Sequence, residues 1–180
     1  GLEIMCKQLS MPMKEINRVS HGTSVGTNAL MQRTGSQVAL ITTSGFRDLL
    51  EIGRQTRPHM YDLQLDHPAP LVARRHRLEL NERVDAAGEV IRSPNLEDIN
   101  SAIEEIIAIR ADAVAIGFLF SFRNDVHEQK FAEELRKRLP DIAISISSEV
   151  QPEFREYERL STTVLNAYLQ PVMRHYLKTL

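Results

Sequence analysis

The chain has 180 residues, of which 42% are hydrophobic and 26% are charged, and its formal net charge is −2. This length suffices for one domain, or for one domain and a small lobe, around a buried core. The balanced charge gives no electrostatic reason to expect binding to nucleic acid or to an acidic membrane surface. No apolar run approaches the roughly 20 residues of a membrane-spanning helix.

The cysteine content and the two ends of the chain indicate which kinds of site to exclude and whether the chain is part of a longer protein. Cys6 is the single cysteine, which excludes an internal disulfide framework and an all-cysteine zinc site. Nothing at the N-terminus resembles a signal peptide, so we expect a cytoplasmic protein. Both ends fall inside apolar-periodic patterns, around Leu2, Met5 and Leu9 and again before Leu180. We therefore expect a fragment of a longer protein.

Strand and helix patterns alternate along most of the chain. Short β-branched stretches predict strands that are buried on both faces of a sheet, and they cover residues 16–20, 37–43, 113–120 and 142–147. Between them, apolar residues recur at helical spacing, at Leu96, Ile99, Ile103, Ile106 and Ile107 and then at Phe131, Leu135 and Leu139. This repeated order predicts an α/β fold with a mainly parallel sheet and crossover helices.

Residues 57–95 differ, because they hold four prolines and show no helical period. Leu78, Leu80 and Val84 alternate with polar residues, and residues 85–88 then carry a turn signal. This pattern predicts an antiparallel β-hairpin inserted between two α/β halves. An insertion of this kind either carries binding loops or is structural decoration.

The last segment predicts one long amphipathic helix with an apolar stripe that runs from Phe154 to Leu180. Pro171 is expected to kink it, because a mid-helix proline removes one backbone hydrogen bond. We therefore expect an α/β lobe over residues 1–150 and a helix over residues 151–180 that leads to a missing second lobe.

The segment that begins at His21 (HGTSVGTN) follows a predicted strand and opens a helix. Backbone N–H groups at a helix start, the room left by Gly22 and the hydroxyls of Thr23, Ser24 and Thr27 suit an anion or a carbonyl oxygen. His21 can exchange a proton near neutral pH. The alternative is that Thr23 or Ser24 merely caps the helix and that His21 is a hydrogen-bonded core residue.

Arg54 and Arg57 lie where a predicted helix ends and the proline-rich segment begins. Two guanidinium groups at the mouth of a loop suit a carboxylate or a phosphate, because each offers paired donors in a fixed geometry. Alternatively, the two arginines bind helix-end carbonyls or surface acids.

A second polar segment surrounds His127. Asn124 or Asp125 is expected to cap the helix that follows, and Asp125 with Glu128 has capping-box spacing. His127 lies one turn before Phe131, which indicates a packing role. A His–Glu pair is too little for a metal site, and no metal ligands are predicted anywhere in the chain. The sequence also lacks the glycine-rich phosphate loops, the nucleophile elbow and the H-E-x-x-H motif.

Five stretches, taken in order, carry a family resemblance: HGTSVGTNAL, ALITTSGFRDLLEIGRQTRPHMYDL, ERVDAAGEVI, NDVHEQ and SSEVQPEFREYERLSTTVLNAYLQPVM. Together they span nearly the whole chain. They resemble the N-terminal domain of the hydantoinase A / 5-oxoprolinase proteins.

The resemblance implies a truncated lobe of the actin- and sugar-kinase-like (ribonuclease H-like) ATPase fold. It implies ATP with Mg²⁺ as cofactors, and a reaction that opens hydantoins or 5-oxoproline after phosphorylation of the carbonyl oxygen. The family's D-x-G-G-T-x-T-D phosphate hairpin and its second lobe are absent from this sequence, so we expect the chain alone to be inactive. The implied partners are a small cyclic amide, the second lobe and a hydantoinase B-type subunit.

The resemblance also implies roles for particular residues. The expected catalytic residues are His21 and Thr23. The expected substrate- or phosphate-binding residues are Gly22, Ser24, Thr27, Asn28, Arg54 and Arg57. Three positions depart from the commoner family pattern, since Ser24 replaces a threonine, Gly26 an alanine and Asp125 a proline, but none of these changes removes a necessary chemical group. Two alternatives stay open: a lobe of an ATP-dependent ketone carboxylase subunit, and a non-catalytic lobe that assembles with a partner.

Overall fold

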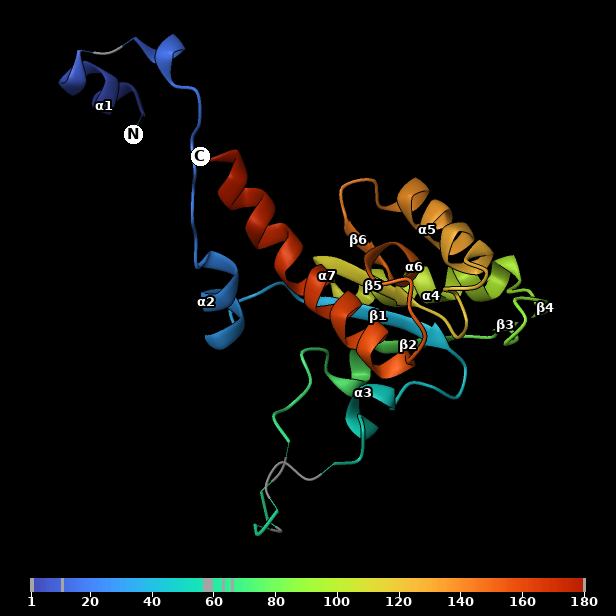
Figure 1. The fold of residues 1–180 in the computed structure, drawn as a ribbon. Helices are drawn as coiled ribbons and strands as arrows, with labels where there is room; N and C mark the ends of the chain where they lie inside the picture. The colour runs from blue at the N-terminus through green and yellow to red at the C-terminus, as the bar shows by residue number, and fades with distance from the viewer. Residues whose placement is uncertain (1, 11, 57–59, 63, 66, 180) are drawn as a thin grey trace.

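The computed structural model describes residues 2–10, 12–56, 60–62, 64–65 and 67–179. At its centre is a four-stranded parallel sheet with the strand order β2-β1-β5-β6 (Figure 1). The strands are β1 (Val38–Thr43), β2 (Arg77–Leu80), β5 (Ala113–Gly117) and β6 (Ala143–Ile146). Every residue of β1 and β5 is buried, as expected for central parallel strands with both faces covered.

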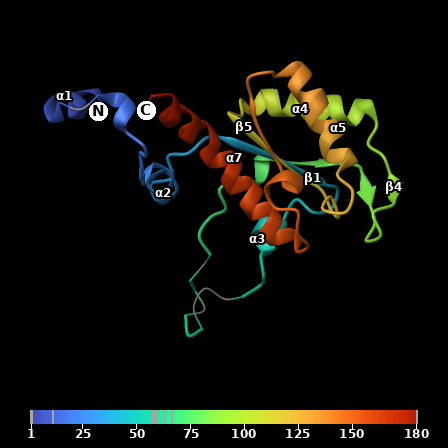
Figure 2. The same ribbon diagram turned by 45° about the horizontal axis from the view of Figure 1, so that its top comes forward.

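Helices cover the two faces of this sheet. On one face, α4 (Leu96–Ile109) packs against β1 and β2, and α5 (Val126–Arg138) packs against β5 and β6. Ala39 and Ile41 of β1 belong to the core on this face. On the other face, α7 (Glu156–Lys178) packs against Val38 and Leu40. Successive β1 side chains thus enter different cores, which is the period-2 alternation of a strand. Figure 2 shows α7 lying across the sheet, opposite α4 and α5.

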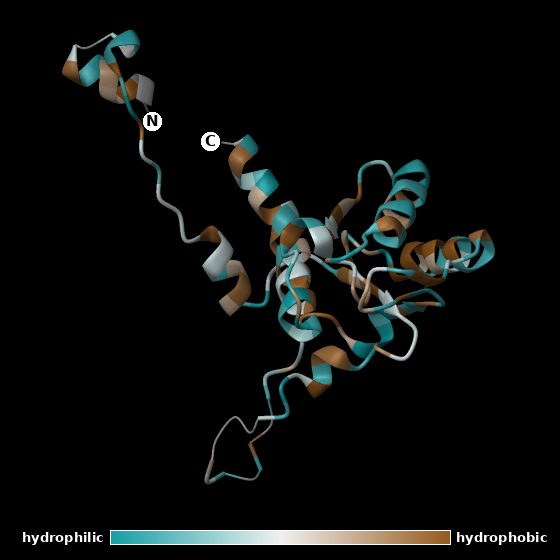
Figure 3. Cartoon of the chain, turned by 45° about the vertical axis from the view of Figure 1, so that its right-hand side comes forward, coloured by the Kyte–Doolittle hydropathy of each residue, from teal (hydrophilic) through white to brown (hydrophobic). Residues whose placement is uncertain are grey.

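The two helices on the first face differ in composition. In Figure 3, α4 is mostly apolar and α5 mostly hydrophilic, which matches their sequences LEDINSAIEEIIAI and VHEQKFAEELRKR. The helix α4 begins at the N-cap Asn95, whose side chain accepts a hydrogen bond from the Asp98 N–H at 2.6 Å. Among the described residues, no helix is long and apolar enough to cross a membrane.

The remaining helices are short. They are α1 (Leu2–Leu9), η1 (Met13–Glu15), α2 (Val25–Met31), α3 (Leu49–Ile52), η2 (Arg74–His76) and α6 (Ser147–Val150). In Figures 1 and 2, α1 stands away from the sheet at the end of an extended segment, whereas α2 lies beside α7.

Three of the four predicted strands are confirmed, and one is wrong. Residues 16–20 form no strand, and Val19 is 57% exposed. No strand among the described residues pairs with this segment, so its backbone has no neighbouring strand with which to form hydrogen bonds. The third strand ends at Gly117 instead of residue 120, because the chain turns at Phe118–Arg123, where Phe120 has a positive φ of 55°.

The predicted hairpin is correct only in its second half. Leu78 and Leu80 belong to β2, which pairs in parallel with β1 and extends the main sheet. The antiparallel pair is limited to β3 (Arg83–Val84) and β4 (Val90–Arg92). Alternation of apolar and polar residues predicted the strand at Leu78 and Leu80 correctly. The same alternation occurs in an edge strand of a sheet and in a hairpin, so it could not distinguish the two pairings.

The predicted C-terminal helix is confirmed as α7, which starts at Glu156 and continues through Pro171. It appears as one continuous ribbon in Figures 1 and 2. Tyr168 of this helix is 5% exposed, and its hydroxyl accepts a hydrogen bond from the Gly35 N–H at 2.8 Å. This bond joins the segment that enters β1 to the middle of α7.

Gly35→Ala tests this junction. A Cβ at position 35 would overlap the buried Tyr168 ring, so we expect the free energy of unfolding to fall by about 1–3 kcal/mol. Urea denaturation of both proteins measures the change. Gly22→Ala is the matched control, because a Cβ there meets nothing within 4 Å, and an equal loss in the two variants would contradict the packing described.

Candidate functional site

The segment from His21 to Asn28 lies on the surface beside α7. His21, Thr23 and Ser24 are exposed, and the His21 Nε2 atom contacts the Tyr176 hydroxyl, with the ring centroids 5.8 Å apart. The alternative of a core histidine is therefore wrong. The Thr23 Oγ1 atom accepts a hydrogen bond from the Val25 N–H at 3.2 Å, so this hydroxyl also braces the start of α2.

The remaining residues of this segment are open to solvent or fix α2. The Asn28 side-chain amide donates to the Ser24 hydroxyl at 3.2 Å, and Thr27 is exposed. Gly26 faces α7, where a Cβ would lie 3.6 Å from the Met173 sulfur. Exposed hydroxyls beside an imidazole can donate hydrogen bonds to a phosphoryl or carbonyl oxygen.

Arg54 lies just beyond α3 and forms an ion pair with Glu158 of α7. The Glu158 pKa lies below its ordinary value, chiefly because a backbone N–H donates to the carboxylate and also because Arg54 lies beside it. The alternative that this arginine binds a surface acid is therefore confirmed. Arg57 lies outside the described residues.

The structure does not bring His21 and Arg54 together. Their partners, Tyr176 and Glu158, lie near opposite ends of α7. A helical rise of 1.5 Å per residue puts these two positions about 27 Å apart along the helix axis. A small cyclic amide cannot contact both residues in this arrangement.

A cavity of about 820 Å³ lies beside Arg54, between α3, residues 67–71 and the first half of α7. Its apolar lining includes Ile52, Pro70 and Val164, and its polar lining includes Tyr157 and Ser161. Gly53 has a φ of 52°, and a Cβ there would lie 3.6 Å from the Tyr157 ring. The turn after α3 thus packs closely on one wall of this cavity.

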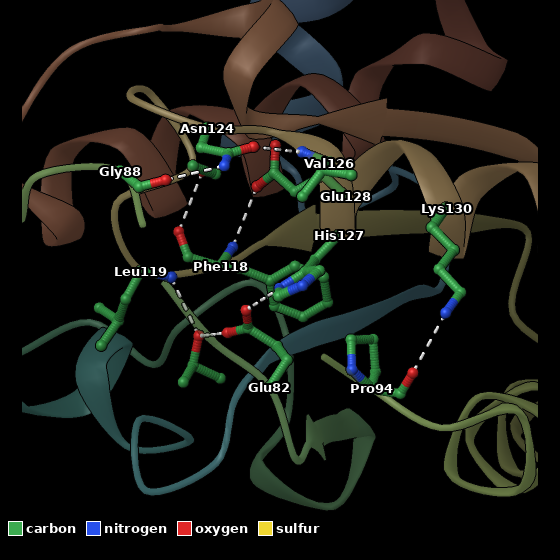
Figure 4. Close-up of polar contacts among 12 residues, drawn as sticks. Glu82, Gly88, Pro94, Phe118, Leu119, Asn124, Val126, His127, Glu128 and Lys130 are labelled. Atoms are coloured by element: carbon green, nitrogen blue, oxygen red, sulfur yellow. Dashed lines mark hydrogen bonds and ion pairs between the residues drawn. The ribbon is translucent and has the colours of Figure 1, made fainter. Parts of the chain in front are cut away.

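A second polar cluster lies beyond the carboxyl ends of the strands (Figure 4). Glu128 is fully buried, and its Oε1 atom accepts hydrogen bonds from the Phe118 N–H at 3.0 Å and the Ser147 hydroxyl at 2.6 Å. Its Oε2 atom accepts a hydrogen bond from the Ser148 N–H at 3.0 Å. One carboxylate thus joins the turn after β5 to the start of α6.

The carboxylate of Glu82 organises the neighbouring half of this cluster. Its Oε1 atom accepts a hydrogen bond from the Thr43 hydroxyl, and its Oε2 atom lies 2.7 Å from the His127 Nδ1 atom. The Thr43 oxygen also accepts a hydrogen bond from the Leu119 N–H at 2.9 Å. Because Glu82 and His127 are 2% and 3% exposed, this pair positions the backbone and is closed to a substrate.

The predicted capping box at Asp125 and Glu128 is wrong. Asp125 is the N-cap of α5 but makes no side-chain capping bond, and Glu128 points to the strand ends instead. Asn124 does accept a hydrogen bond from the Val126 N–H at 3.2 Å. The sequence contained a signal for the actual role, since polar residues often gather beyond the carboxyl ends of parallel strands.

No group of three or more His, Cys, Asp or Glu residues suited to a metal ion occurs within the described part of the chain. The exposed hydroxyls near His21 are donors that fit phosphate oxygens, whereas a divalent cation needs oxygen acceptors, several of them charged. The exposed hydroxyls of this segment are thus chemically able to donate hydrogen bonds to a phosphate oxygen.

Comparisons with known proteins identify relatives. Residues 1–139 match the family model described as the hydantoinase/oxoprolinase N-terminal region. The alpha subunit of caprolactamase from Pseudomonas jessenii is 39% identical over 88% of this chain and 23% of that protein. Among its curated relatives, the chain spans from 14% to 25% of their length.

Two solved structures share the fold. The crystal structure of ATP-dependent caprolactamase from Pseudomonas jessenii superposes with a TM-score of 0.88 and 36% identity, over 99% of this chain and 27% of that one. Nucleotide-free acetone carboxylase gives a TM-score of 0.74 at 25% identity, over 84% of this chain and 23% of that one. The fold is thus the α/β lobe expected from the sequence.

Glu128→Ala tests the strand-end cluster. Removal of this carboxylate leaves the buried Phe118 N–H without its acceptor, so we expect a loss of at least about 3 kcal/mol in the free energy of unfolding. Glu133→Ala, an exposed position on the same helix, should change it by less than about 0.5 kcal/mol. Urea denaturation compares the two variants, and similar small losses would contradict the role assigned to Glu128.

Proposed function

The chain belongs to the hydantoinase/oxoprolinase family, and from this premise we propose that it forms the N-terminal lobe of an ATP-dependent cyclic-amide hydrolase. The observation that carries the proposal is the match to ATP-dependent caprolactamase over 99% of the chain at a TM-score of 0.88. The substrates that we propose are small cyclic amides such as hydantoin, 5-oxoproline or a simple lactam. The location that we propose is cytoplasmic.

The chemical problem in such a reaction is the poor reactivity of an amide carbonyl toward water. The chemistry that ATP supplies when bound is a phosphoryl group, which turns the amide oxygen into a good leaving group. The protein's part is then mainly positioning and charge stabilisation.

We assign that part to the segment beside α7. His21 and Thr23 are the proposed catalytic residues, with His21 moving a proton and the Thr23 hydroxyl donating to an oxygen of the phosphoryl group or the amide. Support comes from their exposure and from the contact of His21 with the Tyr176 hydroxyl, which fixes the imidazole. Gly22, Ser24, Thr27 and Asn28 are the proposed phosphate- or substrate-binding residues around them.

Arg54 belongs to a part of the proposal away from His21. Arg54 is paired with Glu158, far along α7 from the partner of His21, so we assign it to the cavity and not to the phosphoryl group. Arg57 is kept as a proposed substrate- or phosphate-binding residue. Mg²⁺ is proposed to accompany the nucleotide and to be held through its phosphate oxygens.

Partner subunits and a second lobe complete the proposed enzyme. The caprolactamase relative is named as a subunit alpha, which supports assembly of this chain with a hydantoinase B-type subunit. A second candidate is a lobe of an ATP-dependent ketone carboxylase, supported by the likeness to acetone carboxylase. The greater similarity to caprolactamase favours the hydrolase.

His21→Ala and Thr23→Ala in the complete gene product test the catalytic assignment. With hydantoin, 5-oxoproline and ε-caprolactam as substrates, we expect ATP-dependent ring opening of at least one by the wild type, and a fall of about 100-fold in kcat/KM in His21→Ala. Thr23→Ala should lose about tenfold, since one hydrogen bond to a charged group is removed.

The control is Ser101→Ala, an exposed position on α4, which should retain wild-type kinetics. The 180-residue chain alone should show no turnover. Unchanged kinetics in both His21→Ala and Thr23→Ala would contradict the site, and ATP-dependent fixation of carbon dioxide onto a ketone without ring opening would favour the carboxylase.

A further inference from the structure

A small hollow opens where the chain enters β1 and β2. Its walls come from the turn before β1, from residues 71–76 and from Tyr168 of α7. Its volume of about 310 Å³ lies near the lower end of the range of about 300–1,000 Å³ that ligand pockets usually have. The hollow therefore has room for a small ligand only.

The Tyr168 hydroxyl supplies a donor hydrogen that the fold does not use. Tyr168 is 5% exposed, and its oxygen accepts a hydrogen bond from the Gly35 N–H at 2.8 Å. A phenol can also donate one hydrogen bond, but no acceptor for that hydrogen occurs among the residues that the structure describes. Because a buried donor without an acceptor is costly, an acceptor atom placed in the hollow would stabilise this side chain.

The other polar groups of the hollow are also able to donate. Arg33 lies two residues beyond α2 and carries a guanidinium, which can only donate, and Ser36 adds a hydroxyl. The pKa of His76 lies below its ordinary value, chiefly because burial disfavours the charged ring and also because Arg75 lies beside it. The His76 Nε2 atom accepts a hydrogen bond from the Arg75 Nε–H at 3.2 Å, so the neutral ring carries its hydrogen on Nδ1, as a further donor.

The charge around the hollow is positive. Its described lining contains no Asp or Glu. Arg33 and Arg75 form no ion pair with any other described residue. Asp112 contributes one negative charge beside the lining, where its carboxylate accepts a hydrogen bond from the Gln37 N–H at 2.9 Å, and the two arginines outweigh it. Donors with excess positive charge favour an anion whose atoms are acceptors only.

We propose that this hollow binds a small oxyanion, one of whose oxygens accepts the Tyr168 hydrogen while another pairs with the Arg33 guanidinium. Phosphate and carboxylate groups share this chemistry, since a guanidinium matches the spacing of their oxygens. The inference does not rest on the proposed hydrolase. Tyr168 lies eight residues before Tyr176, or about 12 Å along the axis of α7, so the hollow is separate from the segment at His21.

The test is a titration of the isotope-labelled 180-residue chain with inorganic phosphate and, separately, with acetate, followed by amide chemical shifts in NMR spectra at neutral pH and constant ionic strength. We expect saturable shifts at Gly35, Ser36 and Tyr168, and the anion that binds more tightly identifies the natural group as a phosphate or a carboxylate. Saturation by neither anion, or shifts confined to residues 21–28, would overturn the inference. Acetamide, which has the shape of acetate without its charge, is the control, and saturable binding of acetamide would overturn the charge argument.

Arg33→Asn tests the charged donor. Arg33 has a φ of 55°, a conformation that asparagine adopts readily, so the change removes the guanidinium without straining the turn. We expect the affinity for the anion to fall about tenfold. Arg110→Asn is the matched control, because Arg110 is an exposed arginine with a φ of 56° at the end of α4, and it should leave the affinity unchanged. Equal losses in the two variants would indicate attraction by net charge alone and would overturn the site.

Tyr168→Phe tests the buried donor. It removes one hydroxyl, and we expect it to weaken binding of the anion about five- to tenfold, with the fold verified in the same spectra. Unaltered binding in Tyr168→Phe would overturn the placement of the anion. Where this variant does not fold, Arg33→Asn, at an exposed position, still decides the inference.

Discussion

The backbone just beyond β5 imposes the constraint on which the rest of the structure depends. The Phe118 and Leu119 N–H groups leave the sheet inside the protein, where unpaired donors are costly. Glu128 of α5 and Thr43 of β1 accept these two hydrogen bonds. The Phe118 carbonyl in turn accepts a hydrogen bond at 2.7 Å from Arg159 of α7. One turn therefore fixes the positions of a strand and two helices.

This arrangement explains why the polar groups beyond the carboxyl ends of the strands stabilise the fold and do not form a ligand site. The strand order reverses between β1 and β5, which in open parallel sheets is where a crevice for a ligand usually lies. Here, the carboxylates of Glu82 and Glu128 fill that position. The accessible polar groups lie instead along α7, which carries the contact to His21 near one end and the cavity near the other.

Much of the fold could be predicted from the sequence, because its central strands and helices have unambiguous periods. The buried runs at β1 and β5 and the stripe of α7 are examples. The strand predicted at residues 16–20 does not form. β-Branched composition predicts a strand, but it does not supply the neighbouring strand that the backbone requires. The strand that contains Leu78 and Leu80 was predicted correctly, but its pairing was not. Alternation of apolar and polar residues identifies a half-buried strand and does not show which strand it pairs with.

The candidate site was less predictable, since it depends on which distant residues meet. The exposed hydroxyls after His21 follow from the sequence, and so does an acidic partner for Arg54. The separation of these two residues along α7 does not, because it depends on how α2 and α3 pack against opposite ends of one helix. Glu128 was assigned to a cap because local spacing cannot reveal an acceptor for a backbone group ten residues earlier in the chain.

The central claim is that this lobe serves an enzyme that opens cyclic amides through ATP-dependent activation of their carbonyl oxygen. The most direct measurement follows that oxygen atom. A cyclic amide labelled with oxygen-18 at the carbonyl that is attacked would be opened by the complete gene product with ATP, and the products analysed by mass spectrometry. The account predicts that the label leaves in inorganic phosphate. One water attacks the phosphorylated amide and the carbon–nitrogen bond breaks, which opens the ring and leaves an acyl phosphate, and a second water then attacks the same carbon and breaks its bond to the phosphorylated oxygen. Retention of all the label in the ring-opened acid, or ring opening that needs no ATP, would contradict it.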